Sequence, residues 1–160
     1  MFSSALLAVL NPSHAQYGIE HSENGLLINL SEATRNAIDS GVSLTFICDF
    51  AVQKKWWFLT FPSEQQRHKF IISRHSLSNR YLVHRDDKPT PATFRSSSQG
   101  VAHISKSVQN LFAAYAREKP AIELKVSLSK YDLPAPIRLT AFTSAQWNFD
   151  SGWGQWQSIN

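Results

Sequence analysis

The sequence predicts a mainly β domain of the α+β class. We expect an antiparallel sheet or sandwich of about six to eight strands, with one short and one long helix packed on it. Residues 42–53 alternate between apolar and polar side chains, as in a long strand with one buried face. Residues 122–129 alternate in the same way. Residues 101–115 carry apolar side chains at helical spacing, which predicts a long helix that ends before Pro120.

Two short elements are predicted ahead of the long strand. Residues 25–30 alternate as a first strand. Ser31 is a suitable N-cap for a two-turn helix over 32–40, and Gly41 is a suitable residue to end that helix. The long strand follows directly. Its cysteine, Cys48, lies on the apolar face, which predicts a buried and unreactive thiol.

Turn residues divide the rest of the chain. Pro62 predicts a turn over 59–63 before a second long strand over 67–77, and a tight hairpin turn is expected at 77–80. The other predicted elements are a return strand that begins at 81–83 and ends at 86–89, a short strand near 92–95, a loop at 96–100, a stiff connection at 132–136 and a last strand from 137 to 141. Short turns between successive strands favour antiparallel pairing.

The beginning of the chain has features of a secretory signal peptide. An apolar run over 5–10 precedes Ser13-His14-Ala15, which has the small-residue spacing of a signal-peptidase site. The run is short and no Lys or Arg precedes it, so we interpret residues 1–15 as a truncated signal peptide. Residues 16–160 then form a single exported domain in the periplasm. The alternative is the apolar N-terminus of a cytoplasmic protein. The rest of the chain contains no apolar run as long as a transmembrane helix.

Basic residues concentrate in the middle of the chain. Residues 54–95 hold nine of the 16 Lys and Arg residues but only three acidic ones. Such a stretch suits an anionic partner, although exposed strands also carry Lys and Arg for solubility and to block edge pairing. We expect Arg67 and Lys69 to share one face of their strand and Arg74 to lie on the other, all as surface charges.

The five tryptophans have two interpretations. Exposed indoles make strong binding anchors, whereas buried indoles would form a core cluster that pins the C-terminal tail onto the end of the long strand. We favour the buried cluster because indoles are usually largely buried. Adjacent residues Trp56 and Trp57 face opposite ways in an extended chain, so at most one enters the core easily. The candidate interaction surface comprises Lys54, Lys55, Trp56, Trp57, Arg67, Lys69, Arg80, Trp153 and Trp156.

The histidines of the basic region do not predict a metal site. His68 and His75 are an odd number of residues apart, so they point to opposite faces of a strand. His84 forms no ligand pair with either of them, and the adjacent Asp86 and Asp87 suit a solvated turn. We therefore predict no catalytic residue, no metal and no cofactor.

Several stretches together resemble one family of bacterial proteins, the domain of unknown function DUF4390. The resemblance runs from about Leu26 to Trp156. It is carried by Glu32-Ala33 and the stretch from Gly41 to Phe46, by Trp56-Trp57-Phe58 after Lys54-Lys55, by residues 75–81, by Leu133-Pro134-Ala135-Pro136, and by Trp147-Asn148 with Ser151-Gly152-Trp153. The resemblance implies an exported protein with a signal peptide, often encoded beside a membrane sensor kinase and its regulator. It implies no activity.

The preferred function is a non-catalytic periplasmic interaction module, linked to envelope sensing or signalling. It would bind a protein or an anionic envelope component through the basic hairpin and the aromatic surface. The alternative is a small enzyme that acts on an envelope polymer through carboxylates that the sequence does not identify. A nucleic-acid binder is disfavoured, because the aromatic and basic residues do not interleave and because export argues against it.

Overall fold

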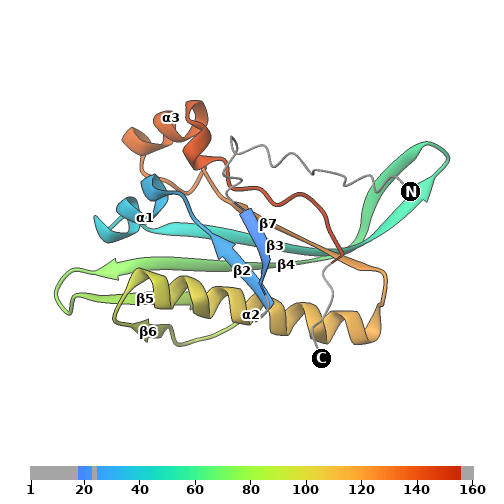
Figure 1. Cartoon of the computed structure of the whole chain (residues 1–160), viewed down its shortest axis with the longest axis horizontal. Coiled ribbons are helices and arrows are strands. Elements are labelled where there is room, and N and C mark those ends of the chain that lie inside the picture. Colours follow the sequence, from blue (N-terminus) through green and yellow to red (C-terminus); the bar gives the residue numbers. More distant parts are fainter. Residues whose placement is uncertain (1–17, 23–24, 156–160) are drawn as a thin grey trace, which may run out of the picture.

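The computed structural model describes residues 18–22 and 25–155, which form two antiparallel sheets and three α-helices (Figure 1). The larger sheet has the order β6-β5-β4-β3-β7, and the smaller one pairs β1 with β2. This confirms the predicted mainly β, α+β class. The elements are β1 (Gly18–Ser22), β2 (Gly25–Asn29), α1 (Glu32–Asp39), β3 (Leu44–Trp56), β4 (Leu59–His75), β5 (Arg80–Arg85), β6 (Ala92–Phe94), α2 (Ser97–Glu118), β7 (Ile122–Leu128), α3 (Ala135–Thr143) and the 3-10 turn η1 (Ala145–Trp147).

Strand β3 is an interior strand of the larger sheet, with β4 on one side and β7 on the other. Its predicted apolar face is buried: Leu44, Phe46, Cys48 and Phe50 have no exposed surface. Burial raises the pKa of the Cys48 thiol, so this cysteine stays protonated and unreactive as expected. The alternating pattern therefore identified the face of β3 on which the core is built.

Helix α2 lies across the sheet together with β2 (Figure 1). Ile104, Val108 and Phe112 of its apolar stripe are buried, as predicted. The helix begins earlier than expected, within the predicted loop at 96–100, because the side chain of Ser96 caps it by accepting a hydrogen bond from the Gln99 N–H (3.2 Å).

Helix α1 has the predicted caps at both ends. The Ser31 hydroxyl accepts a hydrogen bond from the Thr34 N–H at 3.2 Å. At the other end Gly41 adopts a φ of +93°, and Val42 N–H donates to Ala37 O at 2.9 Å. This bond is the signature of a Schellman motif, whose left-handed position favours glycine.

Two predictions beyond β3 are wrong. Residues 59–63 belong to β4 and not to a turn; the turn lies at Trp57 and Phe58. Pro62 is tolerated because β5 pairs with β4 only from Phe70 onward, so this part of β4 is an edge where a missing N–H is harmless.

The predicted last strand over 137–141 is instead part of helix α3. Pro134 and Pro136 flank its start, and proline there has the backbone angle that a helical first turn needs. Three apolar residues at alternate positions were too few to separate a strand from a helix. The short strand β1 was also not predicted.

The C-terminal segment runs along the outer edge of β7. Leu124 and Gly154 exchange backbone hydrogen bonds of 2.9 and 3.1 Å, and Leu128 N–H donates to Phe149 O at 2.9 Å. The buried Phe149 ring meets Phe46 edge-on, with centroids 5.7 Å apart. This segment thus covers an edge that would otherwise expose unpaired backbone groups.

None of the helices in the described ranges combines the length and the apolar character that a membrane span requires.

Loss of a core side chain from β3 or β7 should strongly destabilise the domain. Phe46→Ala should lower the free energy of unfolding by about 3–5 kcal/mol and Leu124→Ala by about 2–5 kcal/mol, because both side chains are fully buried. Urea unfolding measures both losses. Leu77→Ala is the matched control: Leu77 is exposed in the β4–β5 turn, so its change should stay within about 0.5 kcal/mol. Comparable losses in all three variants would contradict this assignment of the core.

Candidate interaction surface

The hairpin of β3 and β4 extends well beyond the rest of the sheet. Strand β7 pairs with β3 only from Phe46 to Val52, and β5 pairs with β4 only from Phe70 to His75. Residues 53–62 therefore pair with each other alone among the described strands, and they project from the body of the domain (Figure 1). We call residues 53–62 the β3–β4 tip.

A two-residue turn closes the β3–β4 tip. The last pair is Trp56 with Leu59, which leaves Trp57 and Phe58 in the turn. Trp57 has a φ of +56°, a left-handed conformation that such a turn requires and that a tryptophan rarely adopts. The turn thus holds an aromatic residue where glycine or asparagine is usual.

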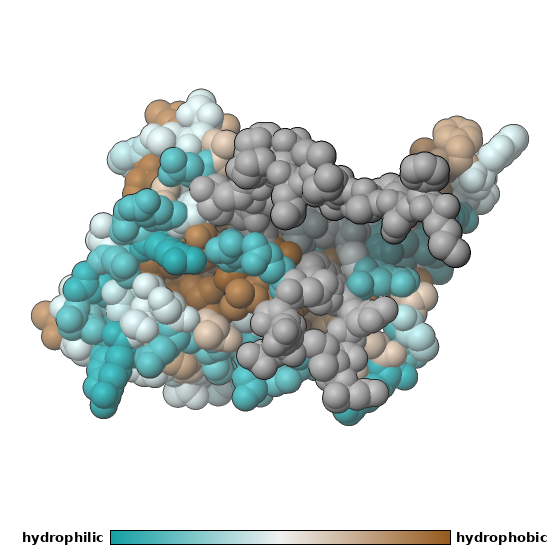
Figure 2. Space-filling model, viewed as in Figure 1, coloured by the Kyte–Doolittle hydropathy of each residue, from teal (hydrophilic) through white to brown (hydrophobic). Residues whose placement is uncertain are grey.

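Large apolar side chains surround the end of the tip. Trp57 is 91% exposed and Phe58 82%, and their rings contact each other with centroids 6.3 Å apart. Trp56, Leu59 and Phe61 are also exposed. Figure 2 shows the tip projecting from the body of the molecule at the upper right, coloured tan and white. A contiguous group of exposed apolar residues of this kind marks an interaction site more often than chance surface exposure.

The favoured interpretation of the tryptophans, a core cluster that pins the tail, is therefore wrong for Trp56 and Trp57. The tip extends beyond the parts of β3 and β4 that β7 and β5 pair with, and both tryptophans are exposed among the described residues. Trp147 is buried beside α1 and belongs to the core. Trp153 is half-buried near the edge of β7, away from the tip in sequence and pairing, and Trp156 lies outside the described residues.

Charged residues stand at the base of the tip. Lys54 and Lys55 are exposed on the two rungs next to the aromatic end, where they pair with Phe61 and Thr60. The nearest acid, Glu64, forms ion pairs with Lys54 (Oε1 to Nζ, 3.8 Å) and with Lys119. The hydrogen bond from Lys119 lowers the pKa of the Glu64 carboxyl, so Glu64 remains ionised and partly neutralised by its two partners.

The basic residues of β4 and β5 divide between the two faces of the sheet as expected. Lys69 pairs with Ile47, and Arg80 pairs with His75, which places both on the face opposite the core and leaves both exposed. Arg74 lies on the core-side face, where its Nε donates to Asn79 Oδ1 at 3.0 Å.

Arg67 differs from the other basic residues because it is already paired. Its Nε and Nη2 donate to the two carboxylate oxygens of Asp49 at 2.6 and 3.1 Å. The Asp49 side chain is only 8% exposed, whereas that of Arg67 is 54% exposed. The hydrogen bonds and charge of Asp49 raise the pKa of Arg67. Arg67 therefore compensates a buried carboxylate and is a weak candidate for contact with a partner.

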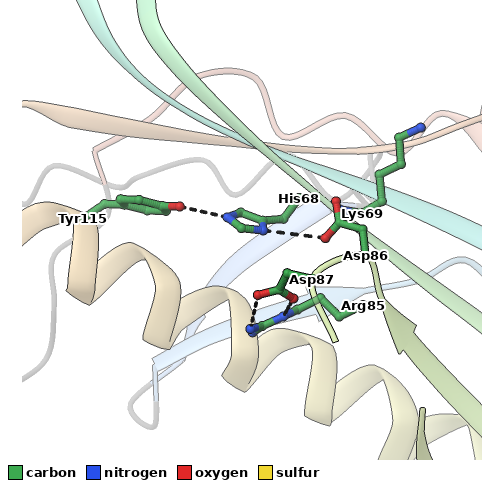
Figure 3. A network of polar contacts seen from close by, with 6 residues as sticks. All are labelled: His68, Lys69, Arg85, Asp86, Asp87 and Tyr115. Carbon is green, nitrogen blue, oxygen red and sulfur yellow. Dashed lines mark hydrogen bonds and ion pairs between the residues drawn. The ribbon is translucent and has the colours of Figure 1, made fainter. Parts of the chain in front are cut away.

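A second polar network joins α2 to β4 and the β5 end (Figure 3). His68 Nε2 lies 2.9 Å from Tyr115 Oη, and His68 Nδ1 lies 3.7 Å from Asp86 Oδ1. Asp86 also accepts a hydrogen bond from the Lys69 N–H at 3.1 Å. Asp86 and Asp87 are exposed turn residues, as predicted, and they also lie close to His68 across the hairpin.

The observed β4–β5 register brings these residues together. His75 pairs with Arg80 and Phe70 with Arg85, and the same register continued outward places His68 opposite Asp87. The tight turn predicted at 77–80 would instead pair Leu77 with Arg80, a shift of two residues that moves both acids away from His68.

The network contains atoms that could bind a metal cation, but one of its carboxylates is already bound by a guanidinium. Ligand atoms of His68, Asp86 and Asp87 all lie within 4.8 Å of one another. However, the Asp87 carboxylate is bound by the Arg85 guanidinium, with Nη2 at 2.6 Å from Oδ2, and this hydrogen bonding lowers the pKa of Asp87. A metal ion would have to displace that guanidinium, so the arrangement suits a structural clamp better than a metal centre.

An apolar groove lies between β2, α1 and α2, on the face that Figure 2 shows. Leu27, Leu30 and Val101 contribute to its walls, and the charged residue at its rim is Arg35. Arg35 Nη2 lies 3.4 Å from Asn29 Oδ1. The groove is lined mainly by apolar side chains, and none of the described residues that line it is a carboxylate.

Comparison with protein families finds one match: the model of a domain of unknown function, DUF4390, covers residues 22–157. No curated protein and no solved structure matches the chain. The matched region includes the β3–β4 tip, the network of Figure 3 and the C-terminal segment on β7.

Removal of Arg67 should destabilise the fold although the residue is on the surface. Arg67→Gln should lower the free energy of unfolding by about 1–2 kcal/mol, because the Asp49 carboxylate loses its partner; solvent screening of the 54% exposed guanidinium keeps the loss small. Lys69→Gln is the matched control on the same strand and face, and it should change the free energy by no more than about 0.5 kcal/mol. Equal effects of the two changes in urea unfolding would show that the pair with Asp49 contributes nothing.

Proposed function

Since the chain belongs to DUF4390, a family of unknown function, we propose its role from its own geometry: it is a non-catalytic interaction module that holds the β3–β4 tip out to a partner in the cell envelope. One observation carries this proposal. Trp57 and Phe58 are almost fully exposed at the end of a hairpin that projects beyond the core. Burial of such large aromatic side chains against a partner is strongly favourable, because it removes a large apolar surface from water.

The construction of the tip supports a binding role. Its strands are continuous with β3 and β4, and the buried half of β3 anchors them in the core. A side chain that is held on such a scaffold loses little freedom when it binds, so more of its contact energy remains as affinity. Aromatic anchors near the centre of a contact are also the residues that most often dominate binding.

Charge favours an anionic partner. Lys54 and Lys55 flank the aromatic end, whereas Lys69 lies further along β4 and Arg80 pairs with His75 at the end of β4 opposite the tip. The positive charge at the tip is therefore that of the two lysines. Such a field raises the rate of encounter with an anionic surface and falls off with added salt. Arg67 is left out of this surface because Asp49 occupies its guanidinium.

A small enzyme that acts on an envelope polymer is the second candidate. The observation that favours it is the convergence of His68, Asp86 and Asp87. The ion pair of Asp87 with Arg85 and the contact of His68 with Tyr115 leave less capacity for proton transfer there, which is why we prefer the interaction module.

Export to the periplasm is part of this proposal. The apolar run and Ser13-His14-Ala15 support it, although residues 1–17 lie outside the described part of the chain. Expressed in its native host, the protein should be recovered from the periplasm with an N-terminus at or near Gln16. N-terminal sequencing measures this directly. A cytoplasmic protein that retains the residues before Gln16 would contradict export.

The β3–β4 tip should contact its partner in living cells. A photoactivated cross-linking amino acid in place of Phe58 should give discrete adducts, because this side chain is 82% exposed at the end of the tip. The same amino acid in place of Leu77, which is 93% exposed in the β4–β5 turn, is the matched control and should give none of these adducts. Identical adduct patterns at the two positions would mean that the tip has no partner of its own.

A further inference from the structure

We propose that the partner of the β3–β4 tip is a lipid bilayer with anionic headgroups. Trp57 and Phe58 enter the interfacial region, and Lys54 and Lys55 meet the lipid phosphates. This inference rests on the proposed function, since it assumes that the tip is the contact surface, and it names the class of partner that the tip binds.

The order of side chains along the tip matches the depth profile of a bilayer interface. The turn residues Trp57 and Phe58 come first, the pair of Trp56 with Leu59 comes next, and the rungs of Lys55 and then Lys54 follow. A strand rises about 3.3 Å per residue, so the two lysines stand roughly 7–10 Å behind the turn. Amphipathic elements bury their apolar side about 5–10 Å into the boundary of headgroups and acyl chains, which leaves the ammonium groups at the level of the phosphates.

The residue types suit each level of that profile. Tryptophan is enriched at membrane interfaces because its ring is apolar and its N–H still bonds water or headgroups. Lysine has a long apolar stem that lets its charge reach the phosphates. The acid nearest to the tip, Glu64, is already paired with Lys54 and Lys119, so it presents little free negative charge to an anionic surface.

The two lysines favour a planar surface over a groove on a protein. Lys54 and Lys55 are neighbours in a strand, so they project from opposite faces of the hairpin. A partner that bound one face would leave one lysine in solvent. A surface into which the end of the hairpin is pressed meets both lysines together, and an anionic bilayer is such a surface.

The backbone of the tip can enter the interfacial region to this depth without leaving its hydrogen-bonding groups unsatisfied. Cross-strand pairs continue to Trp56 and Leu59, so the inward-facing backbone groups are paired with each other. The outward-facing groups stay hydrated, because the interfacial region contains water whereas the hydrocarbon core does not. The tip therefore enters the interface without crossing the bilayer.

The experiment attaches an environment-sensitive fluorophore to the full-length protein through Phe58→Cys. The native Cys48 is fully buried, so labelling is confined to the introduced thiol. Phosphatidylcholine vesicles that contain phosphatidylglycerol should shift the emission to the blue, and nitroxide groups near the headgroups should quench it more than groups deep in the acyl chains. The same label at Leu77→Cys is the control and should not respond.

Vesicle co-sedimentation measures which residues carry the affinity. Trp57→Ser with Phe58→Ser should weaken binding to anionic vesicles by more than about tenfold, since both apolar side chains leave the interface. Lys54→Gln with Lys55→Gln should weaken it by about 25-fold, because each basic residue near an anionic surface contributes about fivefold. Leu77→Ser is the matched control and should bind as the wild type does. Circular dichroism checks that each variant is folded.

The outcomes separate this inference from the proposed function. Absence of binding to anionic vesicles, together with a protein adduct at position 58 in cells, overturns the bilayer and leaves the interaction module intact. If neither vesicle binding nor a protein adduct at position 58 is observed, the bilayer inference and the interaction module are both overturned. Equal binding to vesicles of phosphatidylcholine alone, or binding that does not fall with salt, overturns the role given to Lys54 and Lys55.

Discussion

The domain depends on the burial of one face of β3. Leu44, Phe46 and Phe50 lie on that face with no exposed surface, between β4 and β7 and beneath α2. Each such side chain stabilises the fold by about 1.5–3 kcal/mol relative to an exposed position. The opposite face then carries the buried Asp49, and Arg67 on the next strand donates two hydrogen bonds to its carboxylate.

The same strand connects the core to the candidate interaction surface. The first part of β3 is covered on both sides, whereas its last residues pair with β4 alone and carry the exposed turn. A hairpin of this length would bend freely in isolation, but here its base is fixed by the core. The packing that buries Phe46 thus also fixes the base of the hairpin that carries Trp57 at its end. The first part of β3 thus stabilises the fold, and its last part carries the proposed binding surface.

Neighbouring elements decide what each aromatic residue does. Trp147 is buried against α1, Trp57 is exposed at the tip, and Tyr115 reaches from α2 to His68. All three lie in stretches whose local sequence permits either burial or exposure. The network of His68 depends on the β4–β5 register, and the tight turn predicted at 77–80 differs by two residues from the observed pairing of His75 with Arg80. Its electrostatic outcome was not predictable, because it depends on Arg85 binding Asp87 within the same strand end.

The amino-acid sequence by itself determined the class of the fold, the buried faces of β3 and β7, the apolar stripe of α2 and the caps of α1. It did so because periodicity and capping are local: they report which side of an element is apolar and where a helix ends. Only the tertiary structure decided that 137–141 is helical, that Arg67 serves a buried acid, and that the two adjacent tryptophans are exposed. The exposure of a strand end depends on whether β5 and β7 are long enough to cover it. That is a relation between distant segments, and no local pattern around Trp57 contains it.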